Sequence, residues 1–444
     1  MFRFIRRGTF YGGIFLPSEK SSTENRPIEP LPLPERLYVP VAEGAVPAVH
    51  NGDRVRAGQR LARSESGYQD TFCPVDGRVR ALAVAATAWD DEVLTVEIEV
   101  QQERLTPPSS TAASPPDWTA IAEDAVTQAV LLGAGSARAD NGGLAAEQIK
   151  QARQRGVAHV IVNGMESEPC RTADHRLLVE FGALVVGAAH RLHEYLDAKR
   201  TYVAVDAAQK ELVRAMHELA RRTPIRVVDL QNRYPVGTDP LLVQTLLGRE
   251  IPLGREALDI GALVLGVDTI FHLGRALSEQ VPATARVLTV AGAAIDRPGN
   301  YWVPNGTPVR HVLQSAGLKS QPSQLIVGGP MTGRSLPDDD VVLTLRCPAL
   351  LALLPQDGTR APSTACVRCG WCAEVCPMML EPALLLQAIE LQQERQLARL
   401  HPGACIDCGL CSYVCPSSLP LASSISDVRA SLENGTDRGQ TNGA

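Results

Sequence analysis

Two runs of cysteine near the end of this chain constrain its fold more than any other feature. The first run is Cys366-x2-Cys369-x2-Cys372-x3-Cys376-Pro377, and the second repeats that spacing at Cys405, Cys408, Cys411 and Cys415. The spacing is typical of loops that ligate [4Fe–4S] clusters, in which three cysteines hold one cluster and the fourth holds its neighbour. We therefore expect one cluster on Cys366, Cys369, Cys372 and Cys415, and the other on Cys376, Cys405, Cys408 and Cys411. A glycine in each run, Gly370 and Gly409, allows the backbone to approach the cluster closely.

Two other uses of these cysteines are structural zinc and disulfides. Structural zinc sites usually pair two Cys-x2-Cys units across a longer gap. Disulfides belong to secreted proteins, and the basic start MFRFIRRGTF is not followed by an apolar run of signal-peptide length. We therefore expect a cytoplasmic protein with metal ligands in both runs. The isolated Cys73, Cys170 and Cys347 are expected to be buried structural thiols.

Composition excludes some functions. The 444 residues include 43 Lys and Arg against 49 Asp and Glu, a net charge of −6, and only 4% are aromatic. A mildly acidic chain with few aromatic side chains favours no nucleic-acid partner. No stretch of 18 uninterrupted apolar residues occurs, so the sequence predicts no membrane span.

The pattern along the chain predicts a multidomain α/β protein. Residues 37–100 alternate short apolar runs and glycine turns, which resembles a barrel-sandwich hybrid, although residues 65–71 lack the carrier lysine of lipoyl domains. Strand and helix patterns then alternate as in a Rossmann-like sheet. A β-β-α-β order follows, as in β-grasp domains, and apolar spacing over 381–400 predicts a helix between the cysteine runs. The expected division is 1–30 N-terminal arm, 31–105 barrel-sandwich-hybrid β module, 106–119 linker, 120–283 Rossmann-like α/β domain, 284–358 β-grasp (SLBB-like) domain, 359–425 helical two-cluster ferredoxin domain and 426–444 flexible tail.

The order of these parts resembles the RnfC family, whose members are subunits of Rnf-type ion-translocating electron transport complexes. The stretches that carry this resemblance are Gly12-Gly13-Ile14, Pro27-Ile28-Glu29-Pro30, Asn163–Pro169, Thr172–Asp174, Tyr234–Gly237, Leu247–Glu250, Gly328–Met331 and both cysteine runs. The α/β and β-grasp parts are also similar to the flavin subunit of respiratory complex I. The resemblance implies FMN and an NADH substrate site in the α/β domain, and membrane subunits and a ferredoxin-like cluster subunit as partners. It also implies a peripheral position on the cytoplasmic face of the inner membrane, with only indirect membrane contact.

The resemblance places flavin contacts in two stretches. Four glycines, Gly133, Gly135, Gly142 and Gly143, stand where the family has a Gly-rich loop, but Arg138 interrupts the pattern and the family's Phe-Pro-Thr is absent. A helix C-cap followed by a turn would explain the same glycines. Asn163, Glu166 and Glu168 follow a predicted strand end, where α/β sheets bind ligands; the alternative for the two acids is a solvated turn. Asp174 has the position of a helix N-cap.

Three functions remain open at this point. The first is a subunit that moves electrons from NADH through FMN to two clusters, coupled by its complex to ion transport. The second is an electron-wiring and docking subunit with two clusters and a vestigial flavin site, which the altered Gly-rich loop favours. The third is a cobalamin reductase, which the β module ahead of the α/β domain disfavours. None of them requires a catalytic dyad or nucleophile, and the sequence indicates none.

Overall fold

The computed structural model describes residues 10–102, 105, 108, 122–134, 145–355 and 362–440. The chain divides into two compact units, each built from segments that are distant in sequence. The first unit comprises Met1–Pro17, Asn232–Asp259 and Thr359–Ala444, and the second comprises Ser18–Gln231 and Ile260–Gly358. The predicted α/β domain at 120–283 is therefore not continuous, because its segment Asn232–Asp259 belongs with the cysteine runs.

The N-terminal β module consists of two small antiparallel sheets. The strands of the larger sheet, in spatial order, are β2 (Arg36–Pro40), β8 (Val93–Val100), β7 (Gly77–Ala85) and β4 (Arg54–Val55). Those of the smaller sheet are β3 (Val46–Pro47), β5 (Arg60–Arg63) and β6 (Thr71–Phe72). Alternate side chains such as Leu37, Val39 and Ile98 fill a core that also contains Cys73. The predicted β module is confirmed.

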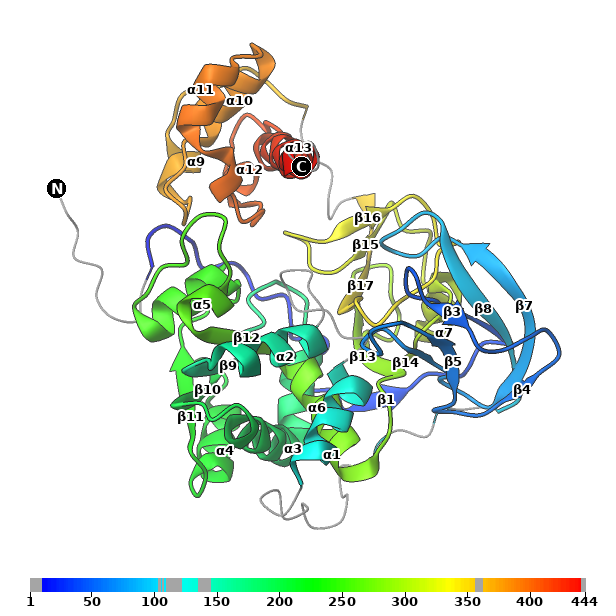
Figure 1. Cartoon of the computed structure of the whole chain (residues 1–444). Helices are drawn as coiled ribbons and strands as arrows, with labels where there is room; N and C mark the ends of the chain where they lie inside the picture. Colours follow the sequence, from blue (N-terminus) through cyan, green and yellow to red (C-terminus); the bar gives the residue numbers. More distant parts are fainter. Residues whose placement is uncertain are drawn as a thin grey trace. The chain divides into compact units, whose positions relative to one another are not determined.

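A parallel four-stranded sheet forms the α/β domain (Figure 1). Its strands, in spatial order, are β11 (Ile225–Leu230), β10 (Arg200–Asp206), β9 (His159–Gly164) and β12 (Ala262–Gly266). The order reverses between β9 and β12, which is the switch point where open α/β sheets bind ligands. The helices around this part of the chain are α1 (Glu123–Ala129), η2 (Val130–Ala134), α2 (Ala145–Arg155), α3 (Ala173–Tyr195), α4 (Lys210–Ala220), η3 (Ala257–Ile260) and α6 (Val267–Glu279).

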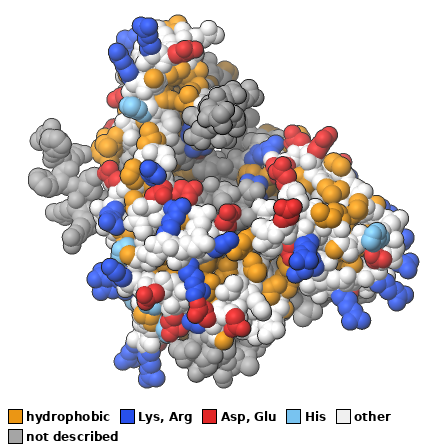
Figure 2. Space-filling view, in the orientation of Figure 1, with side chains coloured by type: hydrophobic (Ala, Val, Ile, Leu, Met, Phe, Trp, Pro, Cys, Tyr) orange, Lys and Arg blue, Asp and Glu red, His pale blue; other side chains and the backbone are white. Residues whose placement is uncertain are grey.

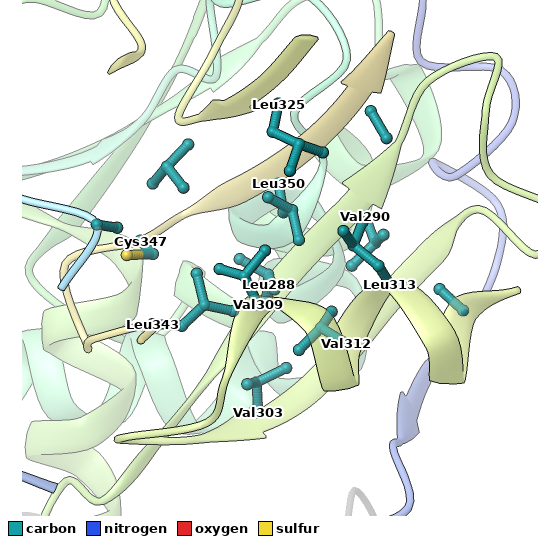
Figure 3. Packing of buried hydrophobic residues seen from close by; sticks show 14 of the residues in the cluster. Leu288, Val290, Val303, Val309, Val312, Leu313, Leu325, Leu343, Cys347 and Leu350 are labelled. Atoms are coloured by element: carbon teal, nitrogen blue, oxygen red, sulfur yellow. The ribbon is translucent and has the colours of Figure 1, made fainter. Parts of the chain in front are cut away.

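The β-grasp part is a six-stranded sheet with one helix, α7 (Val309–Ala316), packed on it. Its strands, in spatial order, are β1 (Ile28–Pro30), β14 (Gly299–Pro304), β13 (Ala285–Ala291), β17 (Ala349–Leu353), β15 (Gln324–Val327) and β16 (Arg334–Leu336). Figure 3 shows side chains of α7 packed with those of the strands; the labelled members are Leu288, Val290, Val303, Val309, Val312, Leu313, Leu325, Leu343, Cys347 and Leu350.

Two strands of this sheet differ from the sequence-based division. The arm predicted at 1–30 contributes β1, which pairs in parallel with β14 at the edge of the sheet. An edge position tolerates its proline, because one side of an edge strand needs no ladder hydrogen bonds. The strand β17 was not predicted, because a continuous apolar run shows no period-2 alternation.

A buried polar network joins the α/β domain to the β-grasp sheet. The Thr172 hydroxyl lies 2.9 Å from Thr23 Oγ1 and 3.0 Å from Asn300 Oδ1. Thr289 Oγ1 donates to Asn300 Oδ1 at 2.8 Å, and Asn300 Nδ2 donates to the Thr23 carbonyl at 3.1 Å. All four residues are buried. The network therefore fixes residues around Thr23 between the two domains.

The cysteine runs lie among short helices, coloured orange to red in Figure 1. They are α9 (Trp371–Glu374), α10 (Pro382–Glu390), α11 (Glu394–Leu400), η4 (Pro402–Ala404), α12 (Leu410–Tyr413) and α13 (Leu421–Gln440). The first unit also contains α5 (Asp239–Leu247).

Two helical predictions near the cysteine runs need correction. The single helix expected over 381–400 is two helices, because Gln392 adopts a left-handed conformation with φ 51°. The flexible tail expected from 426 is instead the continuation of α13, whose Ile425 is buried. Polarity of a segment does not preclude a helix when one turn of it is buried in a core.

The described residues include no helix that is both long and apolar enough to cross a membrane. Charges of both signs are interspersed over the face shown in Figure 2, as expected for a net charge of −6.

Candidate functional site

The two cysteine runs repeat one backbone conformation. Counterpart positions lie 39 residues apart, and each run has three residues with positive φ. Each of the short helices α9 and α12 begins directly after the second of these residues, a glycine. The left-handed pairs are Arg368 and Asp407, Gly370 and Gly409, and Met379 and Ser418. A repeat of this detail indicates two equivalent ligand loops rather than two unrelated cysteine-rich segments.

Four cysteines line one cavity, and they are the set predicted for the second cluster. Cys376 enters this cavity from the first run, and Cys405, Cys408 and Cys411 enter it from the second. The cavity encloses about 370 Å³ when space open to solvent is included, and its other walls include Leu410 and Ile425. The structure thus brings together the three close-spaced cysteines of one run and the fourth cysteine of the other.

The turn after Cys415 is bonded to the segment that leads into Cys366. Thr364 N donates to the Ser417 carbonyl at 3.0 Å, and Ser417 Oγ donates to the Ala365 carbonyl at 2.9 Å. Cys372 and Cys415 also share an apolar cluster with Leu386 and Leu421. Cys415 is therefore placed beside the first run, as its predicted role in the first cluster requires.

The donor set fits iron–sulfur clusters. Burial raises the pKa of the Cys405 thiol to about 11 and those of Cys408 and Cys411 to about 12. These thiols are protonated when no metal is bound, so loading with iron must release protons. Soft thiolate ligands select iron–sulfur clusters, copper(I) or zinc over harder metals. Among the described residues, no three His, Cys, Asp or Glu side chains converge closely enough for a single metal ion.

The three isolated cysteines lie outside these loops. Cys73 and Cys347 are buried, as predicted, and burial raises the pKa of both thiols. Cys170 is only partly buried, although burial still raises its pKa to about 11. Unlike the other two, it is therefore not a fully buried thiol.

A second candidate site lies at the switch point of the parallel sheet. Asn163, at the end of β9, pairs with Gly266 at the end of β12, and its Oδ1 accepts a hydrogen bond from Met165 N at 3.1 Å. No described atom lies within 4 Å of the position that a Cβ on Gly266 would occupy. Gly266 is also the N-cap of α6, and helix N-termini favour anions such as phosphate. The described residues therefore leave room for a phosphate-bearing cofactor such as FMN. Of the four predicted glycines, Gly133 lies in η2, whereas Gly135, Gly142 and Gly143 lie outside the described residues.

The two glutamates predicted for this site have backbone partners and do not form a solvated turn. Glu166 accepts hydrogen bonds from Asp174 N at 3.0 Å and His175 N at 2.9 Å, so it caps α3. Glu168 accepts from Met331 N at 3.1 Å and Thr332 N at 3.0 Å. Both side chains are buried. Glu166, rather than Asp174, thus provides the helix cap.

Buried charges surround these glutamates, and no sequence pattern indicated them. The Lys20 ammonium donates to the Glu166 carbonyl, and burial lowers the pKa of Lys20 even though Glu166 and Asp206 are close. Burial and the nearby Glu166 raise the pKa of Asp174 to about 8. Lys20 is 146 positions from Glu166, and no local pattern predicts a contact across that separation.

Comparison with known protein families divides the chain in the same way. Residues 8–103 match the RnfC barrel sandwich hybrid domain, and residues 126–275 match the Nuo51 FMN-binding domain. Residues 287–335 match the SLBB domain, and residues 365–419 match the 4Fe-4S dicluster domain. The predicted fold class is confirmed for all four parts.

Curated relatives are similar over most of the chain. The chain is 32% identical over 417 residues to the RnfC subunit of an ion-translocating oxidoreductase complex from Pectobacterium atrosepticum, which covers 90% of this chain and 58% of the relative. The subunit of the same name from Pectobacterium carotovorum is 31% identical over 405 residues, covering 88% and 53%. The chain belongs to the RnfC family.

Other RnfC-family comparisons agree with this assignment. The corresponding subunit of a proton-translocating ferredoxin:NAD(+) oxidoreductase complex from Clostridium ljungdahlii is 28% identical over 397 residues, covering 85% of this chain and 83% of the relative. The chain spans little more than half the length of the two Pectobacterium relatives. An NAD+-reducing [NiFe]-hydrogenase structure in the H2-reduced state has a TM-score of 0.51 at 16% identity, covering 73% of this chain and 63% of that one, which is a likeness of fold.

Proposed function

We propose that this RnfC-family chain is a peripheral electron-transfer subunit of an ion-translocating oxidoreductase complex. In this proposal it takes electrons from NADH through FMN, carries them on two [4Fe–4S] clusters and passes them to membrane-bound partner subunits and a ferredoxin-like cluster subunit. Its position would be the cytoplasmic face of the inner membrane. The observation that carries the proposal is the cavity lined by Cys376, Cys405, Cys408 and Cys411, because it unites ligands from both runs.

The chain's own residues would have distinct tasks. Cys366, Cys369, Cys372 and Cys415 would hold the first cluster, and Cys376, Cys405, Cys408 and Cys411 the second. The open space at Gly266 and the amide of Asn163 would receive part of FMN, with Gly133, Gly135, Gly142 and Gly143 as the phosphate-side backbone. Glu166 and Glu168 would hold the surrounding loops in place through their backbone partners. When bound, FMN supplies the conversion between two-electron and one-electron chemistry, and the clusters carry single electrons.

Cofactor analysis of one purified sample tests this function. Anaerobically purified or reconstituted protein should contain about eight irons, as two [4Fe–4S] clusters require, and about one FMN per chain. NADH should then reduce an artificial acceptor such as ferricyanide in steady state. A chain that retains eight irons but binds no added FMN would instead be the electron-wiring subunit. The altered sequence around Arg138 is the observation that favours this second function.

Serine variants test the exchange of ligands between the runs. Cys376→Ser and Cys408→Ser should remove or alter the same [4Fe–4S] signal in electron paramagnetic resonance spectra, although they lie in different runs. Cys369→Ser should alter the other signal and leave that one in place. Cys170→Ser, outside both loops, is the control and should change neither. The ligand sets are wrong if Cys376→Ser gives the spectrum of Cys369→Ser.

A further inference from the structure

The two ligand loops share a backbone conformation but differ in their surroundings. Residues 362–371, which include Cys366 and Cys369, are all exposed, whereas the counterpart residues of the second run are mostly covered. Trp371 is 52% exposed, and its counterpart Leu410 is 0% exposed. Because the loops are otherwise equivalent, the difference must come from the segments of chain packed against each one.

Tyr234 belongs to one of the segments that cover the second loop. Its side chain is only 2% exposed, and its hydroxyl donates to the Cys408 carbonyl at 2.7 Å. It lies 174 positions from Cys408 in sequence, and both belong to the first compact unit. From the opposite end of the unit's sequence, Arg429 on α13 donates to the Cys405 carbonyl at 3.2 Å. Two ligand residues of the second cluster are thus held through their carbonyl groups by distant side chains.

The segment Gly12-Gly13 covers the fourth ligand of the same set. Gly13 N donates to the Val375 carbonyl at 2.8 Å, directly before Cys376. A Cβ on Gly12 would lie 2.7 Å from the carbonyl carbon and oxygen of Cys376, so only glycine permits this approach. Ile14 and Tyr234 are joined by two backbone hydrogen bonds, of 3.0 and 2.8 Å. The residues 12–14 and Tyr234 therefore form one structure, which we call the cover.

We propose that the cover closes the site of the second cluster, so that this cluster is shielded and the first cluster is the one that exchanges electrons with partner proteins. The inference deepens the proposed function and rests on it for the direction of traffic. It assigns Tyr234 and Gly12 as positioning residues, because they contact the backbone of ligand residues rather than the cluster. Solvent exposure and hydrogen bonding around a cluster set its reduction potential, so the two clusters should also differ in potential.

Iron release from the full, cluster-loaded chain tests the shielding. With excess ferrozine as the chelator and ascorbate as the reductant, release should be biphasic, with half of the iron in each phase. In Cys369→Ser the fast phase should be missing, because the first cluster is the exposed one. Tyr234→Phe should accelerate the slow phase about 2- to 10-fold, the range expected for one lost hydrogen bond. Gly12→Ala should accelerate it at least as much.

Matched variants separate the cover from general effects. Tyr413→Phe removes the same hydroxyl group from an exposed residue of α12, and it should leave both phases unchanged. Gly44→Ala places a Cβ at a glycine with a similar φ of 73° but no atom within 4 Å, so it shares the backbone strain without the contact. Single-phase release, or loss of the slow phase in Cys369→Ser, would overturn the proposal.

A readout without clusters keeps the test independent of the proposed function. In iron-free protein treated with iodoacetamide, mass spectrometry should show Cys366 and Cys369 modified well before Cys376 and Cys408. Tyr234→Phe should increase the rate at Cys408 and leave the rate at Cys366 unchanged. Equal rates at Cys366 and Cys408 would refute the cover. Failure to bind iron, in contrast, would refute the proposed function and leave the alkylation result intact.

Discussion

Asp174, in the first turn of α3, has a carboxyl group that the fold keeps largely protonated. Its Oδ1 is buried without a hydrogen-bond partner among the described residues. Burial and the neighbouring Glu166 raise its pKa from 3.8 to about 8, although Arg171 and Arg286 act in the opposite direction. Asp268 is also deeply buried, but there Arg286 and His272 outweigh burial and hold the pKa below its usual value. Two nearby aspartates are thus kept in opposite charge states by their neighbours.

The raised pKa of Asp174 makes stability depend on pH. Between about pH 4 and pH 8 the folded state holds a proton at this site that the unfolded state has lost. The free energy of unfolding should therefore fall as pH rises through this window. Asp174→Asn, which stays neutral, should flatten the dependence. Urea unfolding midpoints from circular dichroism at pH 5, 6.5 and 8 would measure it, with the exposed Asp91→Asn as the control. An unchanged slope in Asp174→Asn would contradict the assignment.

Single residues also show what a sequence can reveal about a site. The eight cluster cysteines were predictable because each ligand loop is local, with ligands two or three positions apart. Tyr234 and Lys20 were not, because their partners lie 174 and 146 positions away. A contact of that kind is a property of the tertiary fold and leaves no periodic signal in a single sequence.

At the scale of elements, the loop between β9 and α3 is fixed by its two glutamates. Glu166 bonds to the start of α3, and Glu168 bonds to the loop between β15 and β16. Gly329 permits this second contact, since a Cβ there would lie 2.1 Å from Glu168 Oε2. The loop that carries the candidate flavin residues is thus tied to the β-grasp sheet.

A Glu168 variant separates this structural role from cofactor contact. Glu168→Ala removes the acceptor for two backbone amides and should lower the free energy of unfolding by about 2–4 kcal/mol, as expected for lost hydrogen bonds to a buried charge. FMN bound per folded chain should remain near that of the unsubstituted protein. Urea unfolding and flavin fluorescence after denaturation give the two quantities. Loss of FMN at unchanged stability would instead identify Glu168 as a flavin ligand.

Elements with a clear period were predictable, and elements defined by their partners were not. The alternating residues of β7 and the β-α alternation from β9 to β11 indicated their structures from sequence. The three-residue strand β1 exists only through its pairing with β14, and prolines surround it. The segment carrying α5 shows no sequence signal that it belongs with the cysteine runs, because the chain leaves the α/β sheet and returns to it.

At the scale of the whole molecule, the two compact units draw stability from different sources. The second unit contains extended apolar cores, one beneath α7 and one in the β module, together with the buried network around Asn300. The first unit has small cores in which cysteines themselves are members, such as Cys376 and Cys372. Structural metal binding contributes folding free energy directly when the core around it is small. Iron should therefore stabilise the first unit and not the second.

Calorimetry of the full chain can distinguish the two sources. The loaded protein should unfold in two transitions, and removal of iron should lower one melting temperature by more than about 5 °C while leaving the other in place. Asn300→Ala should do the reverse. It leaves the buried hydroxyls of Thr172 and Thr289 without their acceptor, a loss of about 2 kcal/mol, and should lower only the transition that iron does not affect. A single transition that responds to both changes would mean that the units unfold together. Two transitions that respond separately would mean that the cluster region can lose its iron and unfold while the α/β and β-grasp domains keep their structure.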